Sequence, residues 1–260
     1  MRPAFHAEHT RDGVAEYDFA LTVDGERVPA VIWTPAGAKG PRPLVLMGHG
    51  GSQHKKAPTL AERAQRYARD HGWATLSIDA FGHGERVSQE EAAATVADIH
   101  SRVRGGERSG PSNLFKTMGE RVRRIVPEWR AALDAAQSMD FIGAGGPVAY
   151  WGMSMGLVCG VPFVAAEPRI TCAVLGLGGI RTGDDAFGAA VRAITAPVLF
   201  VFQWDDVMAT REGGLALFDA LGSAEKTMHI NPGGHTETPA FEQDACDAFF
   251  LRRLGGRAVG

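Results

Sequence analysis

Cysteine is scarce in this sequence. The chain contains three cysteines, an odd number, and each stands in apolar surroundings. A disulfide framework needs many more cysteines in a chain of this size, and a metal cluster needs closely spaced ligands. We therefore expect Cys159, Cys172 and Cys246 to be buried free thiols, and we expect no metal site.

The sequence also lacks an excess of charge of either sign. It has 27 basic and 30 acidic residues, which gives a net charge of −3. A surface that binds nucleic acid needs clustered Lys and Arg, so no nucleic-acid partner is expected. No glycine-rich loop precedes a Lys and a Ser or Thr in the phosphate-binding pattern, so no nucleotide cofactor is expected. Residues 1–13 lack the apolar core of a secretory signal, which makes a cytoplasmic location the expectation.

Charge is missing locally as well, over residues 141–166. A run of this length is long enough to cross a bilayer. Six glycines and two prolines interrupt it, however, whereas a spanning helix would consist mainly of continuous Leu, Ile and Val. We therefore interpret the run as a buried strand, a turn and a buried helix, and expect no membrane partner.

Strand and helix patterns alternate along the chain. Residues 16–35 alternate in polarity on both sides of Asp24-Gly25, which predicts an N-terminal antiparallel hairpin. Further strands are expected at 43–50, 74–80, 147–152, 170–176, 197–203 and 226–230, with helices at 59–72, 129–136, from 155, at 214–222 and from 239. This order predicts an α/β fold with a mostly parallel, doubly wound sheet of about eight strands and helices on both faces. At 260 residues we expect one domain, residues 1–260.

Two helix starts carry recognisable signals. Thr59 and Glu62 have the spacing of a capping box, so a helix is expected to begin at Thr59. Thr238 followed by Pro239 predicts the start of the last helix, with Thr238 as its cap.

The segment 81–117 is too long for a simple connection. Long insertions in α/β domains are often lids or binding loops, so we expect a lid or cap over a pocket. The alternative is a solvated elaboration with one short helix near 88–100. The shorter segment 178–196 is also a candidate for the pocket wall.

Residues 152–156, Gly-Met-Ser-Met-Gly, match the pattern GxSxG. The two glycines let the preceding strand and the following helix approach each other around a strained residue, which raises the hydroxyl of Ser154 above the sheet. A serine hydroxyl needs a base to remove its proton and an acid to orient that base. The expected chain order for this sheet is serine, acid, histidine.

Two later strands supply the partners in that order. His235 follows the strand at 226–230, and Asp205 and Asp206 follow the strand at 197–203. Asp184 and Asp185, which follow the preceding strand, are a weaker alternative for the acid. The oxyanion hole is expected to use the N–H of Met155 and one N–H from residues 49–52, for which Gly51 is the choice.

Several other polar residues are assigned structural roles. We interpret residues 79–86 as a packed turn in which Asp79 holds loop amides and His83 is bonded locally. His49 is expected to be a structural or pocket-lining imidazole, and His54, Lys55 and Lys56 to be solvated. The pocket wall is expected to include Met153, Met155 and Trp204, with Phe81 and Phe115 as further candidates.

Taken together, "PLVLMGHGGS", "IDAFGHGER", "GMSMG", "WDD" and "PGGH" resemble the α/β-hydrolase superfamily, and within it the esterases similar to dienelactone hydrolases and prolyl oligopeptidases. The resemblance covers nearly the whole chain. It implies Ser154 as nucleophile, Asp206 as acid, His235 as base, and the amides of Gly51 and Met155 as oxyanion donors. The chain departs from the pattern in having Ser154 where true dienelactone hydrolases have cysteine, and Thr210 where a proline usually follows the acid.

The expected function is that of a cofactor-free serine hydrolase that cleaves a small carboxylic ester or lactone through an acyl-enzyme. Alternatives with the same three residues are a thioesterase, a peptidase, or a carbon–carbon bond hydrolase or lyase. A ligand-binding protein that kept the fold without the chemistry is a further alternative. The oligomeric state, monomer or homodimer, is left open.

Overall fold

The chain starts with three antiparallel strands. The computed structural model describes residues 4–105, 118–181, 183 and 185–255. The predicted hairpin is confirmed as β2 (Val14–Val23) and β3 (Glu26–Pro35), joined at Asp24 and Gly25, which both have positive φ. A strand that the sequence did not predict, β1 (Phe5–Arg11), pairs antiparallel with β2 at the edge of the sheet. Its side chains are mostly exposed, so it lacks the apolar alternation that identifies a strand.

The remaining strands continue the same sheet. They are β4 (Leu44–Gly48), β5 (Ala74–Ile78), β6 (Val148–Met153), β7 (Ile170–Gly176), β8 (Val198–Gln203) and β9 (Lys226–Asn231). The spatial order is β1-β2-β3-β5-β4-β6-β7-β8-β9, and all pairs from β5 to β9 are parallel. The predicted fold class is confirmed, with nine strands in the described residues instead of about eight.

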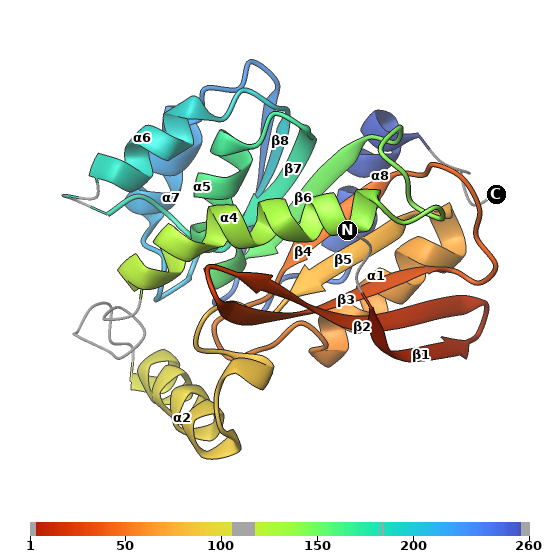
Figure 1. Cartoon of the computed structure of the whole chain (residues 1–260). Coiled ribbons are helices and arrows are strands. Elements are labelled where there is room, and N and C mark those ends of the chain that lie inside the picture. Colours follow the sequence, from red (N-terminus) through yellow and green to blue (C-terminus); the bar gives the residue numbers. More distant parts are fainter. Residues whose placement is uncertain (1–3, 106–117, 182, 184, 256–260) are drawn as a thin grey trace.

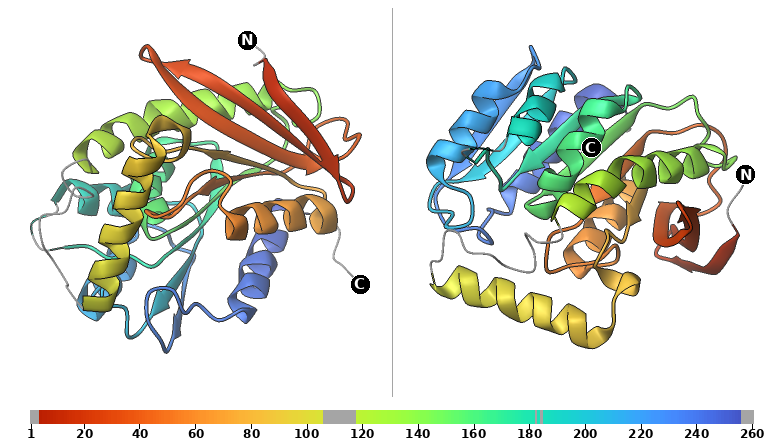
Figure 2. Two further views of the ribbon diagram at one scale, coloured as in Figure 1. Left: turned by 90° about the horizontal axis from the view of Figure 1, so that it is seen from below. Right: turned by 60° about the vertical axis from the view of Figure 1, so that its left-hand side comes forward.

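Helices cover both faces of this sheet (Figures 1 and 2). One face carries α4 (Met118–Gln137), α5 (Met155–Ala166), α6 (Asp185–Ala193) and α7 (Arg211–Ala220). The other carries α1 (Pro58–Arg66), the π-helical turn η1 (Tyr67–His71) and α8 (Phe241–Leu254). The central strands are therefore buried on both sides, which explains why β4 and most of β8 are apolar runs.

Neither predicted helix cap forms, and the two helices begin one residue before and two residues after the predicted first positions. Helix α1 begins at Pro58, a residue that is favourable at the first helical position, and Ala57 precedes it without a side-chain cap. Helix α8 begins at Phe241, two residues after Pro239, because the carbonyl of Glu237 is held by a side chain of β8 and the chain turns before it becomes helical. A capping box does occur at Ser88, whose hydroxyl accepts the N–H of Glu91 while the Glu91 carboxylate accepts the N–H of Ser88.

The insertion at 81–117 contains a short 3₁₀ turn, η2 (Gly84–Arg86), and α2 (Gln89–Gly105). Helix α2 lies at the periphery, outside both helical layers (Figures 1 and 2). Residues 106–117, among them Phe115, lie outside the described residues, and a lid at this position stays a prediction. In the segment 178–196 the structure has α6, a helix that the sequence did not predict.

The uncharged run 141–166 is divided as expected. Its central part forms β6, and Met155 begins α5, with Ser154 between the two. Among the helices of the described residues, none is both long enough and apolar enough to span a membrane.

Candidate active site

Ser154 occupies a sharp turn between β6 and α5. Its backbone has φ 56° and ψ −118°, a conformation that residues with a side chain rarely adopt. The Ser154 N–H donates to the carbonyl of Gly176 at 2.9 Å, and the Ser154 carbonyl accepts the N–H of Leu157. Strain of this kind costs about 1–3 kcal/mol and persists where the surroundings hold it, which is common at active sites.

The two glycines of the GxSxG pattern permit this turn. A Cβ at Gly152 would collide with the carbonyl of Gly156, and a Cβ at Gly156 would collide with the carbonyl of Gly48. Strand β4, strand β6 and the start of α5 therefore meet at backbone distance. The Tyr150 hydroxyl fixes the same contact by donating to the Gly156 carbonyl at 2.7 Å.

Substitution of Gly156 by alanine tests this close packing. We expect Gly156→Ala to lower the free energy of unfolding by about 1–3 kcal/mol, because backbone atoms would have to move. The matched control is Gly188→Ala in α6, where a Cβ would have as its nearest neighbour the Arg192 side chain at 3.4 Å. That control should be neutral or stabilising by up to about 1 kcal/mol. Urea unfolding of the three proteins measures the difference, and equal stability of the two variants would contradict the account.

Ser154, His235 and Asp206 form one hydrogen-bonded chain. His235 Nε2 lies 2.9 Å from Ser154 Oγ, and His235 Nδ1 lies 2.7 Å from Asp206 Oδ2. The other carboxylate oxygen of Asp206 accepts the N–H groups of Met208 at 2.8 Å and Ala209 at 3.1 Å. The Asp206 side chain has no exposed surface and that of His235 is 10% exposed. Neutral His235 can therefore carry its proton on Nδ1 and present Nε2 to the serine hydroxyl.

The neighbouring Asp205 lies at the surface and binds groups other than His235. The Asp205 side chain is 56% exposed and forms an ion pair with Arg211 at 2.9 Å. Its second oxygen accepts the N–H of Gly233, while the Asp205 N–H donates to the Gly233 carbonyl. Asp205 thus braces the loop that carries His235, and Asp206 is the one that reaches the imidazole. Of the weaker alternatives, Asp185 is exposed at the start of α6, and Asp184 lies outside the described residues.

Gln203, the last residue of β8, was missed in the sequence. It is fully buried, and its Nε2 donates to the carbonyls of Pro232 at 3.2 Å and Glu237 at 3.0 Å, on either side of His235. One amide group therefore clamps both ends of the histidine loop. A strand-end glutamine has no sequence signal for such a role, because the two carbonyls are about thirty residues away along the chain.

The loop after β4 holds the peptide between Gly50 and Gly51 in a fixed orientation. Its carbonyl, that of Gly50, accepts His49 Nδ1–H at 2.8 Å and the Gln53 N–H at 3.1 Å. In a trans peptide the N–H points away from the carbonyl, so the Gly51 N–H points to the opposite side. Met155, whose N–H is the other expected donor, is the first residue of α5, where the helix dipole adds partial positive charge.

His49 connects this loop to the one after β5. It is 2% exposed, and its Nε2 accepts the N–H of Ala80 at 3.1 Å, which fixes the neutral tautomer with the proton on Nδ1. Burial, followed by the nearby His83, lowers the pKa of His49 from 6.5 to about 4. The interpretation of His49 as a structural imidazole agrees with these contacts. His83 is not bonded only locally, because its Nε2 reaches the Gly51 carbonyl at 2.8 Å.

The lowered pKa of His49 predicts a pH dependence of stability. Below pH 6.5 the unfolded chain binds a proton at this position, whereas the folded chain does so only near pH 4. The unfolded state therefore binds more protons in this window, and the folded state loses about 3 kcal/mol as the pH falls from 6.5 to 4. We expect His49→Gln to remove most of this component. Urea titrations at a series of pH values give the free energy of unfolding of both proteins. If that free energy fell equally with pH in the unmodified protein and in His49→Gln, the prediction would be contradicted.

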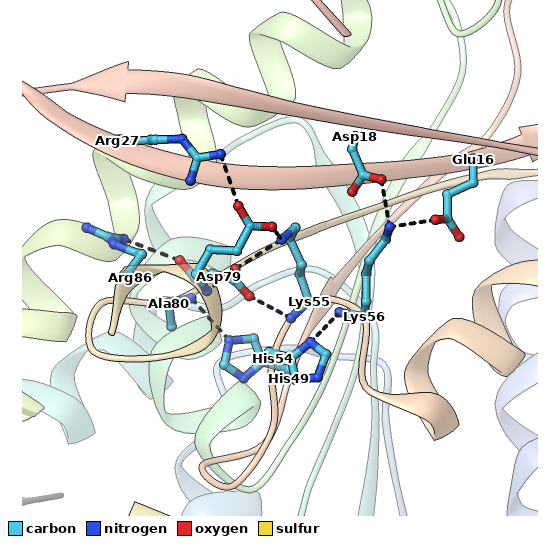
Figure 3. A network of polar contacts seen from close by, with 11 residues as sticks. Glu16, Asp18, Arg27, His49, His54, Lys55, Lys56, Asp79, Ala80 and Arg86 are labelled. Carbon is cyan, nitrogen blue, oxygen red and sulfur yellow. Dashed lines mark hydrogen bonds and ion pairs between the residues drawn. The ribbon is translucent and has the colours of Figure 1, made fainter. Parts of the chain in front are cut away.

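Lys55 and Asp79 join the two loops from the buried side (Figure 3). Asp79 is fully buried and accepts the Lys55 N–H at 2.8 Å, Lys55 Nζ at 3.1 Å and the Glu85 N–H at 3.0 Å. Lys55 Nζ also pairs with the Glu85 carboxylate. The prediction that Asp79 holds loop amides is confirmed. The expectation that Lys55 is solvated is wrong, since it is 3% exposed, and Lys56 instead pairs with Glu16 and Asp18 at 2.6 Å each.

The residues that were predicted to form the pocket wall lie in different parts of the structure. Met155 is buried in the core beneath α5, and Met153 packs with the cluster under α1 and α8. Trp204 is 38% exposed beside Asp205, with the Arg211 guanidinium 4.5 Å from its ring centroid. Phe81 lies under the guanidinium groups of Arg86 and Arg124.

No family model matches the sequence, and no curated protein matches it. Solved structures match over almost the whole chain. The PEG-bound complex of a cold-adapted esterase from an Arctic intertidal metagenomic library has a TM-score of 0.81 and 32% identity, over 98% of this chain and 100% of its own. An acetyl xylan esterase from Paenibacillus sp. R4 has a TM-score of 0.68 and 15% identity, over 97% and 88%. A dienelactone hydrolase from Anabaena variabilis has a TM-score of 0.60 and 21% identity, over 93% and 99%.

These comparisons and the turn at Ser154 define an α/β-hydrolase fold, which the two more distant structures share. The similarity to the cold-adapted esterase extends beyond the fold, because nearly a third of the aligned residues are identical over 98% of this chain and 100% of the esterase. The chain belongs to the α/β-hydrolase serine esterases, as the sequence resemblance predicted.

Proposed function

We propose that the protein hydrolyses a small carboxylic ester or lactone, with Ser154 as nucleophile, His235 as base and Asp206 as the acid that orients His235. The observation that carries this proposal is the unbroken chain of hydrogen bonds from Asp206 through His235 to Ser154, at 2.7 and 2.9 Å. The membership of the esterase family supports the same reaction.

The reaction proceeds in two halves. Ser154 Oγ attacks the ester carbonyl carbon while His235 Nε2 takes the hydroxyl proton, and the resulting imidazolium is stabilised by Asp206. The tetrahedral intermediate collapses, the carbon–oxygen bond to the alcohol breaks, and His235 returns the proton to the leaving alkoxide. Water then attacks the acyl carbon with His235 as base. The bond between Ser154 Oγ and the acyl carbon breaks, His235 returns the proton to Ser154 Oγ, and the acid leaves.

The oxyanion that forms in each half needs donors in place. We assign this role to the N–H groups of Gly51 and Met155. The fixed orientation of the Gly50–Gly51 peptide and the position of Met155 at the start of α5 support this assignment. Donors that are already oriented need no reorganisation when the charge appears, and each such donor contributes about 3–4 kcal/mol to lowering the barrier.

An ester or lactone is the substrate class we propose, rather than an amide, a thioester or a carbon–carbon bond. An ester loses an alkoxide, which is a better leaving group than the amine anion of an amide, and a small ester needs no separate specificity domain. A small-molecule substrate, a cytoplasmic location and the absence of nucleic-acid and membrane partners are part of the same proposal. Whether the protein works as a monomer or a homodimer is not implied by the proposed chemistry.

Pre-steady-state kinetics with p-nitrophenyl acetate test the proposal. An acyl-enzyme predicts a burst of p-nitrophenol that approaches one equivalent per protein when deacylation is slower than acylation. A parallel series of p-nitrophenyl esters, γ-butyrolactone and p-nitroanilides identifies the preferred bond. Turnover of the anilides without turnover of any ester or lactone would contradict the proposed substrate class.

A further inference from the structure

A cavity of about 180 Å³ lies on the face of the sheet that α1 and α8 cover. Its wall comes from α1, β6, β8, α8 and the segment that leads into α8, and includes Arg63, Trp151, Met153, Val201, Glu242 and Cys246. None of Ser154, His235 and Asp206 belongs to this wall. The cavity is therefore lined by residues other than those proposed to carry out ester cleavage.

Arg63 brings a positive charge to this cavity. Its guanidinium carbon lies 4.8 Å from the Trp151 ring centroid, and its Nη1 donates to the Tyr67 hydroxyl at 3.3 Å. In the described part of the chain Arg63 has no ion-pair partner, whereas Arg66, one turn further on, pairs with Asp247. Stacking on an aromatic ring uses the face of a guanidinium and leaves its in-plane N–H groups available.

A second donor belongs to another residue of the same wall. Trp151 Nε1 is buried, and the described residues offer it no oxygen or nitrogen acceptor. Its neighbour in the cavity is the Cys246 thiol, and sulfur is a weak acceptor. A buried N–H without a good acceptor costs about 1–3 kcal/mol, so a ligand that supplies an acceptor gains from this position.

The other charged group of the wall is already satisfied. The two carboxylate oxygens of Glu242 accept His229 Nδ1–H and Asn231 Nδ2–H, each at 2.9 Å. Glu242 is 3% exposed and so has little capacity to bind a further donor. Arg63 and Trp151 thus offer donors to this cavity, one of them a cation, and Glu242 accepts from neither of them.

We propose that this cavity binds a small carboxylate with an apolar body. A carboxylate matches the in-plane donors of a guanidinium and accepts from an indole N–H with its remaining lone pairs. Trp151, Met153 and Val201 supply the apolar wall for the body. A cavity of about 150 Å³ holds a benzene ring, so the space here accommodates a ligand of the size of benzoate.

Three probes of equal size test the charge preference: benzoate, benzamide and benzylamine. Ligand-observed NMR titrations of the complete protein should give benzoate a dissociation constant of about 1 mM or lower, and at least tenfold weaker binding for the other two. Arg63→Met should weaken benzoate about tenfold or more, and Trp151→Phe about threefold. Arg63→Lys keeps the charge but not the planar donors, so its affinity for benzoate should lie between those of Arg63→Met and the unmodified protein.

The matched control is Arg69→Met, which removes an exposed arginine from the end of the same helical segment. It should bind benzoate like the unmodified protein. Circular dichroism of each variant establishes that it is folded. Benzoate that binds only near Ser154 would bind Arg63→Met unchanged, and this result overturns the proposal without touching the proposed ester cleavage. Equal binding of the three probes, preferred binding of benzylamine, or no saturable binding of benzoate overturns it as well.

Discussion

Ser154→Ala should lower kcat for the best ester substrate by about 10⁵-fold or more. The variant loses the atom that attacks the carbonyl, and neither His235 nor Asp206 can replace it. Alanine meets the same backbone strain at φ 56° as serine does, so the free energy of unfolding should change by less than about 1 kcal/mol. Initial rates with a p-nitrophenyl ester and urea unfolding of the same preparation measure both quantities.

The control for this variant is Ser52→Ala, which removes an exposed serine from the loop after β4. Its activity should stay within about threefold of the unmodified protein. If Ser154→Ala retained more than a hundredth of the activity (~1%) after purification from a host without competing esterases, Ser154 would not be the nucleophile.

The second large effect concerns the two adjacent aspartates. Asp206→Asn should lower kcat by about 10⁴-fold. An asparagine amide that donates to His235 Nδ1 forces the imidazole proton onto Nε2, and a protonated Nε2 cannot accept the proton of the serine hydroxyl. If the asparagine amide were flipped, its NH₂ group would face the N–H groups of Met208 and Ala209, which donate to the Asp206 carboxylate in the unmodified protein. Donors would then face donors, so this orientation is unfavourable. The pH profile of kcat/KM should change with the tautomer.

Asp205→Asn is the matched comparison. The Asp205 carboxylate is 56% exposed and binds Gly233 and Arg211, and an asparagine oxygen can still accept the Gly233 N–H. We expect a loss of less than about tenfold. A larger loss of kcat in Asp205→Asn than in Asp206→Asn would show that Asp205, and not Asp206, is the acid that orients His235.

The parts of the account that the sequence could predict are those with local signals. The hairpin turn at Asp24-Gly25 and the pattern at 152–156 are each contained in a few adjacent residues. The mainly apolar strands follow from burial on both faces, and the chain order of serine, acid and histidine follows from the parallel sheet. These signals were sufficient for the fold class and for the candidate residues.

The rest depends on contacts between segments that are far apart in the chain. Lys55 and Asp79 are 24 residues apart, and two adjacent lysines in a loop give no sign that one is buried and the other is not. Gln203 is likewise far along the chain from the carbonyls of Pro232 and Glu237 that accept from it. The choice between Asp205 and Asp206 is decided by which carboxylate turns into the core, and that direction is set by the amides of Met208 and Ala209 after the strand ends.

The central claim is that Ser154 acts as an activated nucleophile in an assembled site. Intact-mass spectrometry after treatment with an alkyl fluorophosphonate tests it most directly, followed by peptide mapping of the labelled residue. The account predicts one adduct per chain, located on Ser154, lost in Ser154→Ala and formed far more slowly in Asp206→Asn. An unlabelled protein that nonetheless hydrolyses esters, or an adduct on another residue, would contradict it.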